Sequence, residues 1–219
     1  LINSSKKNWT IIRPYITYSS DRLQLGVLEK EDWLYRALQG RTIVFSEEIF
    51  SKLTAFTHGL DVSRGIFNVI GETSACGEVF HITSNESKTW GEILNIYMTI
   101  LEKKIGIKPK YKLQKLNDFL KHHHAKPQII YDRIYHRKFD NNKIAFYTEV
   151  SNFIEVEKGL EKCLEDFLKN PIFKRIDWLK EAIKDRETRE RASLYEIKSI
   201  KDKVRYLIYR YIIRKNINN

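Results

Sequence analysis

The chain has 219 residues with 39 Lys and Arg against 28 Asp and Glu, which gives a formal net charge of +11. Hydrophobic residues make up 42% and aromatic residues 12% of the sequence, which excludes an intrinsically disordered chain. The sequence has no run of about 18 apolar residues, no apolar leader segment and only two cysteines, so it favours a cytoplasmic protein rather than a membrane-spanning or disulfide-built one.

The first half of the chain predicts alternating strands and helices. Residues 9–16 are aromatic and β-branched, which is typical of a buried parallel strand, and Pro14 should end its regular pairing. Further strands are expected over residues 41–45, 54–58 and 78–83. Helices are expected over 29–38, over 60–70, and from a capping box formed by Thr89 and Glu92 up to Gly106. This alternation favours an α/β sheet over a helical bundle.

Beyond Pro109 the pattern becomes mostly helical. A short strand is expected over residues 111–113, and helices are expected over 116–121, 155–168 and 176–191. Residues 192–219 then form a basic amphipathic tail. We therefore expect three regions, which are residues 1–113, 114–191 and 192–219.

The C-terminal tail carries close to half of the net charge. Residues 195–219 contain seven Lys and Arg against two acids, interleaved with Val, Leu, Ile and Tyr. Three interpretations fit this pattern: a terminal helix packed on the body, a peripheral membrane contact, and a nucleic-acid contact. We rank the packed helix first and nucleic acid last.

Isolated polar groups give no catalytic constellation. The three histidines at 122–124 cannot all face one metal from a helix, because consecutive residues point about 100° apart, so exposed residues at a helix end are expected instead of a metal site. His58 and Asp61 fit a strand-end residue and a helix cap better than an acid–base pair. Cys76 has no cationic neighbours in sequence to activate it. The Walker A, Gly-x-Gly-x-x-Gly and Gly-x-Ser-x-Gly motifs do not occur.

Six segments, taken in order, carry a family pattern. They are W-T-I-I-R-P-Y-I-T-Y at 9–18, W-L-Y-R-A-L-Q-G at 33–40, F-T-H-G-L-D-V-S-R-G-I at 56–66, G-E-V-F-H-I-T at 77–83 with T-W-G-E-I at 89–93, F-D-N-N-K-I at 139–144, and E-K-G-L at 157–160. In this order they resemble the extended short-chain dehydrogenase/reductases, the NAD-dependent epimerase/dehydratase group that acts on nucleotide sugars. The resemblance covers residues 9–168 and does not extend to the tail.

The resemblance implies an α/β fold, in which residues 1–113 are the C-terminal part of a Rossmann-type sheet. Residues 114–191 would then be a small, mostly helical substrate-binding lobe, followed by a helical C-terminal tail. The chain would be the substrate-binding portion of an NAD- or NADP-dependent epimerase, dehydratase or reductase, which forms a homodimer when whole. The Tyr-x-x-x-Lys pair and Gly-rich loop of the family do not occur before Trp9, so we expect them upstream of Leu1 and no catalytic residue in this chain.

The resemblance also implies site residues. Those expected near the nicotinamide end of the cofactor are Pro14 and Tyr15, and those expected near the substrate are Tyr18, Asp21, Arg22 and His58. A diphosphate requires a cation, ideally a bidentate arginine, and the candidates are Arg133 and Arg137. The sequence departs from the family at Ser19, where glycine is usual, and at Thr54, where many members carry arginine.

Two other classes of function stay open at this point. A catalytically silent member of the family would serve as an RNA- or membrane-surface-binding module, for which the basic tail is suited. A structural domain would have no ligand of its own.

Overall fold

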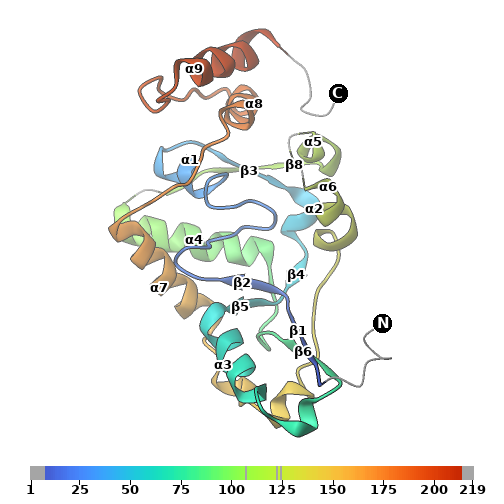
Figure 1. Cartoon of the computed structure of the whole chain (residues 1–219). Helices are drawn as coiled ribbons and strands as arrows, with labels where there is room; N and C mark the ends of the chain where they lie inside the picture. The colour runs from blue at the N-terminus through green and yellow to red at the C-terminus, as the bar shows by residue number, and fades with distance from the viewer. Residues whose placement is uncertain (1–7, 107, 122, 124, 214–219) are drawn as a thin grey trace.

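Parallel strand pairs form the centre of the fold (Figure 1). The computed structural model describes residues 8–106, 108–121, 123 and 125–213. Three pairs are parallel: β1 (Thr10–Pro14) with β6 (Glu78–Ile82), β2 (Ile16–Tyr18) with β5 (Phe56–His58), and β3 (Ile43–Ser46) with β8 (Tyr111–Gln114). The short strands β4 (Leu53–Thr54) and β7 (Lys88–Thr89) pair antiparallel. The predicted α/β class with parallel strands is confirmed.

Helices connect and cover these strands. The longer ones are α3 (Gly59–Val69), α4 (Trp90–Ile105), α7 (Val156–Lys169), α8 (Trp178–Thr188) and α9 (Ile200–Leu207). The shorter ones are α1 (Leu34–Leu38), α2 (Glu47–Phe50), α5 (Leu116–Leu120) and α6 (Lys126–Gln128). Two π-helical turns are η3 (Ile129–Arg133) and η6 (Ile208–Ile212), and single 3₁₀ turns are η2 (Thr73–Ala75), η4 (Ile144–Phe146) and η5 (Val150–Asn152).

Local sequence signals fix the ends of α4 as predicted. The Thr89 Oγ1 accepts a hydrogen bond from the Glu92 N–H at 3.1 Å, and the Glu92 carboxylate accepts one from the Thr89 N–H at 2.6 Å. Gly106 ends the helix with a left-handed φ of 66°, which glycine adopts without steric cost. The helix predicted over residues 29–38 is shorter, because residues 30–33 form turns before it. Within these turns the Trp33 indole donates to the Leu23 carbonyl at 2.9 Å.

The segment predicted as one buried strand over residues 9–16 is two strands that meet at Tyr15. β1 ends at Pro14, and β2 continues with a different partner strand. The prediction of burial is wrong for β1, whose residues are exposed or half-buried. Among the described strands β1 pairs with β6 alone, so its other edge lacks the neighbour that would cover it.

The main hydrophobic core crosses the predicted boundary at residue 113. Trp33, Trp90 and Tyr97 from the first region are buried in the same cluster as Leu160 and Phe167 of α7. Helices α4 and α7 lie side by side over the strands, as Figure 1 shows. One core therefore includes residues of both the first and the second predicted region.

The start of the tail is packed on the body through α8. The Tyr206 side chain is fully buried, and its hydroxyl donates to Asp185 at 2.6 Å while accepting from the Ala192 N–H at 2.7 Å. Trp178, Ala182 and Ile197 complete a separate small core. The helical part of the tail is α9 followed by η6, and residues 214–219 lie outside the described part of the chain.

A buried network of charges joins α8 to the body. The Arg36 guanidinium of α1 is fully buried and donates to Glu181 at 2.7 Å and to Asp185 at 2.8 Å. The Arg41 guanidinium donates to the second Asp185 oxygen at 3.2 Å, and the Lys184 ammonium donates to Glu181 at 2.9 Å. Moving such ions out of water costs several kcal/mol each, so the network is stable only because every charge meets an opposite one.

Removal of one carboxylate from this network should destabilise the fold strongly. Asp185→Asn leaves Arg36 and Arg41 undercompensated in the interior, so we expect the free energy of unfolding to fall by about 3–5 kcal/mol in urea titrations. The control is Glu161→Gln, which breaks an exposed pair with Lys103 and should cost at most about 1 kcal/mol. Equal losses for the two variants would contradict the network.

The network should also make stability depend on acid pH. Burial opposes ionisation of Glu181, but Lys184, Arg36 and Arg41 outweigh it and hold the pKa of this carboxyl below its usual value. Since the folded-state pKa is the lower one, the contribution is present above the ordinary glutamate pKa of about 4.3 and is lost as the pH falls through the folded-state pKa. We expect the free energy of unfolding to decline below about pH 4 more steeply in the native chain than in Glu181→Gln. Parallel pH profiles for the two proteins would contradict this assignment.

Candidate functional site

An arginine cluster lies where β1 ends and β2 begins. It consists of Tyr15 between the two strands, Arg22 after β2, Asp132 and Arg133 of η3, and Arg137. Four of these five residues, all except Asp132, are among the residues expected from the sequence at a cofactor or substrate site. Tyr15, Arg133 and Arg137 all bond to Asp132, and the charge of Arg22 acts on Arg133 from nearby.

One carboxylate ties the cluster together. The Tyr15 hydroxyl donates to Asp132 Oδ2 at 2.9 Å, and the Arg137 Nε donates to Asp132 Oδ1 at 2.7 Å. The Arg133 Nη1 donates both to Asp132 and to the Tyr15 hydroxyl, the latter at 3.2 Å. Asp132 thus accepts hydrogen bonds from the guanidinium groups of Arg133 and Arg137 and from the Tyr15 hydroxyl, and keeps the three side chains close together.

The cluster carries more positive than negative charge. Arg133 is buried with its Nε donating to the Gly26 carbonyl at 3.2 Å. Burial lowers the pKa of Arg133, Tyr15 acts in the opposite direction, and the nearby charges of Arg22 and Arg137 lower it further. Because an arginine stays ionised in proteins, the cluster holds three cations, and Arg22 and Arg137 remain 49% and 34% exposed. Such a partly open arginine set suits an anion with several oxygens.

Aromatic rings pack beside the cluster. The Phe139 ring lies 4.8 Å from the Tyr15 ring and 5.0 Å from the His81 ring, measured between centroids. The segment that carries Phe139 is anchored by Asn141, whose side chain donates to the Thr83 carbonyl at 2.7 Å and accepts from the Thr83 N–H at 3.2 Å. The F-D-N-N-K-I motif therefore fastens this segment to the end of β6.

Sequence reasoning missed Asp132 and Phe139 as members of the site. Phe139 is the first residue of the F-D-N-N-K-I motif, which the sequence did reveal, so the motif could have indicated Phe139 as a site residue. Asp132 sits next to Arg133 in no recognisable motif. Its role is shown by its contacts with Arg137 and with Tyr15, which lies 117 positions away in the chain.

Tyr18 and His58, which the sequence placed near a substrate, lie in the core and not in the cluster. They are register partners in β2 and β5, and both are buried. The His58 Nδ1 accepts from the Leu60 N–H at 3.1 Å, so the neutral ring carries its proton on Nε2, which lies 3.4 Å from the Cys163 thiol. Burial lowers the pKa of His58 and raises that of Cys163 to about 11. The pair is therefore neutral at pH 7.

The prediction that Asp61 caps α3 is wrong, because His58 provides the cap. Asp61 is buried in the first turn of the helix, where its carboxylate accepts from the Ile154 N–H at 2.9 Å and from Arg64 at 3.1 Å. Asp61 thus fastens the segment before α7 to α3. Sequence spacing alone did not reveal that donor, which lies 93 positions further on.

Pro14 and Asp21 lie exposed next to the cluster in sequence, at the end of β1 and after β2. Asp21 contributes its backbone carbonyl to Lys30. The described residues do not by themselves form a dinucleotide cradle, because the chain has no Gly-rich loop and the Tyr15 hydroxyl is held by Asp132 and Arg133. We therefore assign no step of NAD or NADP chemistry to this chain.

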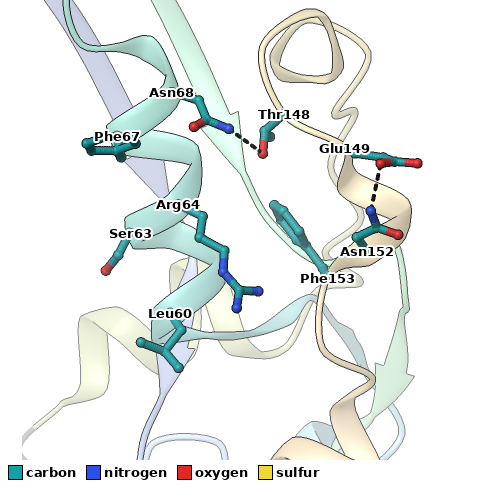
Figure 2. Close-up of a pocket in the computed structure, with 9 residues that line it drawn as sticks. All are labelled: Leu60, Ser63, Arg64, Phe67, Asn68, Thr148, Glu149, Asn152 and Phe153. Atoms are coloured by element: carbon teal, nitrogen blue, oxygen red, sulfur yellow. Dashed lines mark hydrogen bonds between the residues drawn. The ribbon is translucent and has the colours of Figure 1, made fainter.

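A groove of about 730 Å³ lies elsewhere, between α3 and residues 148–153 (Figure 2). The Asn68 amide donates to Thr148 at 3.2 Å across it, and the Arg64 guanidinium on its wall is already paired with Asp61. None of the residues expected from the sequence lines this groove. Its polar lining combines a cation, a carboxylate, hydroxyls and amides, whereas the arginine cluster gathers three guanidinium groups.

The described residues hold no group of three His, Cys, Asp or Glu side chains arranged for a metal ion. His123, predicted to be exposed, is buried with its ring 4.0 Å from that of Phe119, while His122 and His124 lie outside the described residues. Within the same part of the chain, no helix has the length and apolar character needed to cross a bilayer.

Comparison with known proteins adds information on the fold. No protein-family model matches the chain, and no curated protein matches it in sequence. Among solved structures, UDP-glucuronic acid 4-epimerase from Bacillus cereus, in complex with UDP-glucuronic acid and NAD, is 18% identical with a TM-score of 0.53, over 74% of this chain and 46% of that one. An epimerase from Methanothermobacter thermautotrophicus is 14% identical with a TM-score of 0.53, over 73% of this chain and 43% of that one. The dTDP-glucose 4,6-dehydratase from Bacillus anthracis, in complex with NAD, is 20% identical with a TM-score of 0.50, over 74% of this chain and 45% of that one.

At these identities the likeness shows the fold, which is an α/β arrangement of parallel strands resembling part of the Rossmann-type structure of epimerases. The chain spans less than half the length of these solved relatives. The three regions and the site residues stay predictions.

The buried Tyr18 hydroxyl offers a test of its role. Among the described residues it has no hydrogen-bond partner, and an added Cβ at Gly159 would lie 2.1 Å from it. Tyr18→Phe removes an unpaired polar atom, so the free energy of unfolding should stay within about 1 kcal/mol or rise. Gly159→Ala should cost about 1–3 kcal/mol, and less in the Tyr18→Phe background, in a double-mutant cycle of urea titrations. A loss above about 2 kcal/mol for Tyr18→Phe alone would show that the hydroxyl has a partner.

Proposed function

We propose that the chain is the substrate-binding portion of an NAD- or NADP-dependent nucleotide-sugar epimerase, dehydratase or reductase, and that its arginine cluster binds the diphosphate. The observation that carries the proposal is the contact of Arg133 and Arg137 with Asp132, which accepts from Tyr15 at the carboxyl end of β1 beside β6. The positive charge of Arg22 also acts on Arg133. Ligands of α/β sheets bind at that edge. The fold similarity to two epimerases and a dehydratase supports the same assignment.

The three arginines have different tasks in this proposal. Arg133 is fixed by the Gly26 carbonyl and by Asp132, so it supplies a preorganised charge at the base of the site. Arg22 and Arg137 are exposed enough to turn toward a ligand from solvent. An arginine binds two phosphate oxygens at once, which fixes orientation as well as charge.

Asp132 holds the arginines in place before the ligand arrives. Its two oxygens occupy donors of Arg133 and Arg137 that a diphosphate would otherwise use. The ligand therefore competes with this carboxylate for the same guanidinium groups. When NAD or NADP is bound, the nicotinamide would supply the hydride chemistry, and the residues of this chain would bind and orient the sugar nucleotide.

Binding of UDP to the chain tests the proposal directly. By isothermal titration calorimetry we expect UDP to bind, and the double variant Arg22→Gln/Arg137→Gln to weaken binding by about tenfold or more, because two charge-assisted contacts are lost. The matched control is Arg64→Gln/Lys103→Gln, which removes the same charge from exposed positions outside the cluster and should bind as the native chain does. Absence of UDP binding by the folded chain, or equal loss in the control, would contradict the proposal.

The competing carboxylate allows a gain-of-affinity test. Asp132→Asn keeps an acceptor for Tyr15 but removes the negative charge that faces the ligand, so we expect UDP to bind several-fold more tightly in the same titration. Asp166→Asn, which neutralises an exposed residue paired with Lys169, serves as the control and should leave affinity unchanged. Equal or weaker binding by Asp132→Asn would contradict the prediction that the competition of this carboxylate with the ligand outweighs its role in holding the arginines in place.

A further inference from the structure

The outer face of α9 and η6 carries exposed apolar side chains. We define this outer face by Ile200, Val204, Tyr211 and Ile212, which are 78%, 50%, 57% and 74% exposed. The first two are four residues apart on one side of α9, and the last two continue along η6 two turns later. Large apolar side chains gathered on one exposed face mark a contact surface rather than ordinary scatter.

The opposite face of the same helix fixes how the outer face is presented. Tyr206 is fully buried against α8, and Leu207 and Tyr209 pack on the same small core. Arg186 of α8 donates to the carbonyls of Tyr209 and Ile213 at 3.1 and 2.6 Å. The helix is therefore held by its inner face, and the apolar stripe on its outer face is left to another partner.

Cations surround the outer face, and Glu196, one of the two acids of residues 195–219, is turned away from it. Lys198, Lys201 and Arg205 are exposed, Lys203 is half-buried, and none of the four forms an ion pair within the described part of the chain. Glu196 points inward, where it accepts from Tyr35 at 2.9 Å and from Arg41 at 3.0 Å. The surface that remains is cationic and apolar together.

The place of α9 in the molecule leaves this face accessible. Figure 1 shows α9 at one end of the structure, with α8 lying between it and the strands. A flat partner could therefore approach the helix without meeting the rest of the described chain.

We propose that the outer face of α9 and η6 docks on an anionic lipid surface. A membrane interface accepts both kinds of group at once: aliphatic side chains enter the acyl boundary to about 5–10 Å, and lysines and arginines meet the headgroups. Tyr211 matches the preference of tyrosine for the interface. Nucleic acid would engage the cations through its phosphates but would leave Ile200, Val204 and Ile212 without a partner.

Vesicle flotation with the full chain tests the proposal. The protein should float with vesicles of phosphatidylcholine mixed with phosphatidylserine, should not float with phosphatidylcholine alone, and should be released by salt. Two variants should each lower the bound fraction by about tenfold: Ile200→Ser/Val204→Ser/Ile212→Ser and Lys198→Gln/Lys201→Gln/Lys203→Gln/Arg205→Gln. Their circular dichroism and urea midpoints should match the native chain, because most of these side chains are exposed.

Matched controls separate the outer face from general stickiness. Lys103→Gln/Lys108→Gln/Lys158→Gln/Lys169→Gln removes the same charge from exposed lysines elsewhere, and Phe146→Ser/Ile172→Ser removes exposed apolar groups elsewhere. Both controls should float as the native chain does. Equal recovery with the two vesicle types, or equal loss in the controls, would overturn the proposal. The proposal would also be overturned if the native protein did not float and instead bound duplex RNA. It would likewise be overturned if the native protein did not float and formed a dimer that the apolar variant did not form.

Discussion

Parallel pairing of the strands is the constraint on which the candidate site depends. Parallel neighbours end side by side, so β1 and β6 bring their carboxyl ends together at Pro14 and Ile82, beside the start of β2. Tyr15 follows β1 at that edge, and Thr83 follows β6 there. Residues 129–143 then cross the edge, held at one point by the Asn141 amide on Thr83 and at another by Asp132 on Tyr15. A single crossing segment thereby delivers two arginines and an aromatic ring to one place.

Charge balance distinguishes the pair Arg36 and Arg41 from the arginine cluster, although the two sets look alike in the sequence. Arg36 and Arg41 meet the carboxylates of Glu181, Asp185, Glu190 and Glu196, so both guanidinium charges are neutralised and they serve to join α8 to the body. The arginine cluster has three guanidinium groups but only Asp132 bridging two of them, while Arg22 faces Glu29 at 3.9 Å. A surplus of positive charge at a strand edge is costly unless an anion shares it. That surplus is why the cluster, and not the more deeply buried network, is suited to ligand binding.

The buried network has a second consequence at the far end of the chain. Because Arg36 fixes α8, and Asp185 of α8 accepts from the Tyr206 hydroxyl, the same carboxylate that neutralises the body arginines also orients α9. Use of Glu196 by Arg41 and Tyr35 removes an acid from the surface of the tail. The cationic character of the outer face is thus partly a result of the inward orientation of Glu196.

The sequence by itself determined the features that local chemistry encodes. The Thr89–Glu92 capping box, the glycine end of α4 and the apolar stripe of α7 depend on residues a few positions apart, so their patterns are legible in one dimension. The ordered motifs were sufficient for the α/β class, and they gave Tyr15, Arg22, Arg133 and Arg137 as candidates without showing that they meet. Gly159 of the E-K-G-L motif is an intermediate case, because the motif is visible in sequence but its cause, the Tyr18 hydroxyl beside it, is not.

Only the tertiary structure decided the contacts that span the chain. Tyr15 meets Asp132 across 117 positions and Arg36 meets Asp185 across 149, distances over which no periodicity persists. Burial of Tyr18 and His58, exposure of β1 and the inward turn of Glu196 likewise depend on which elements become neighbours. The physical reason is that helix caps and apolar faces are set within one turn, whereas burial and ion pairing are set by topology.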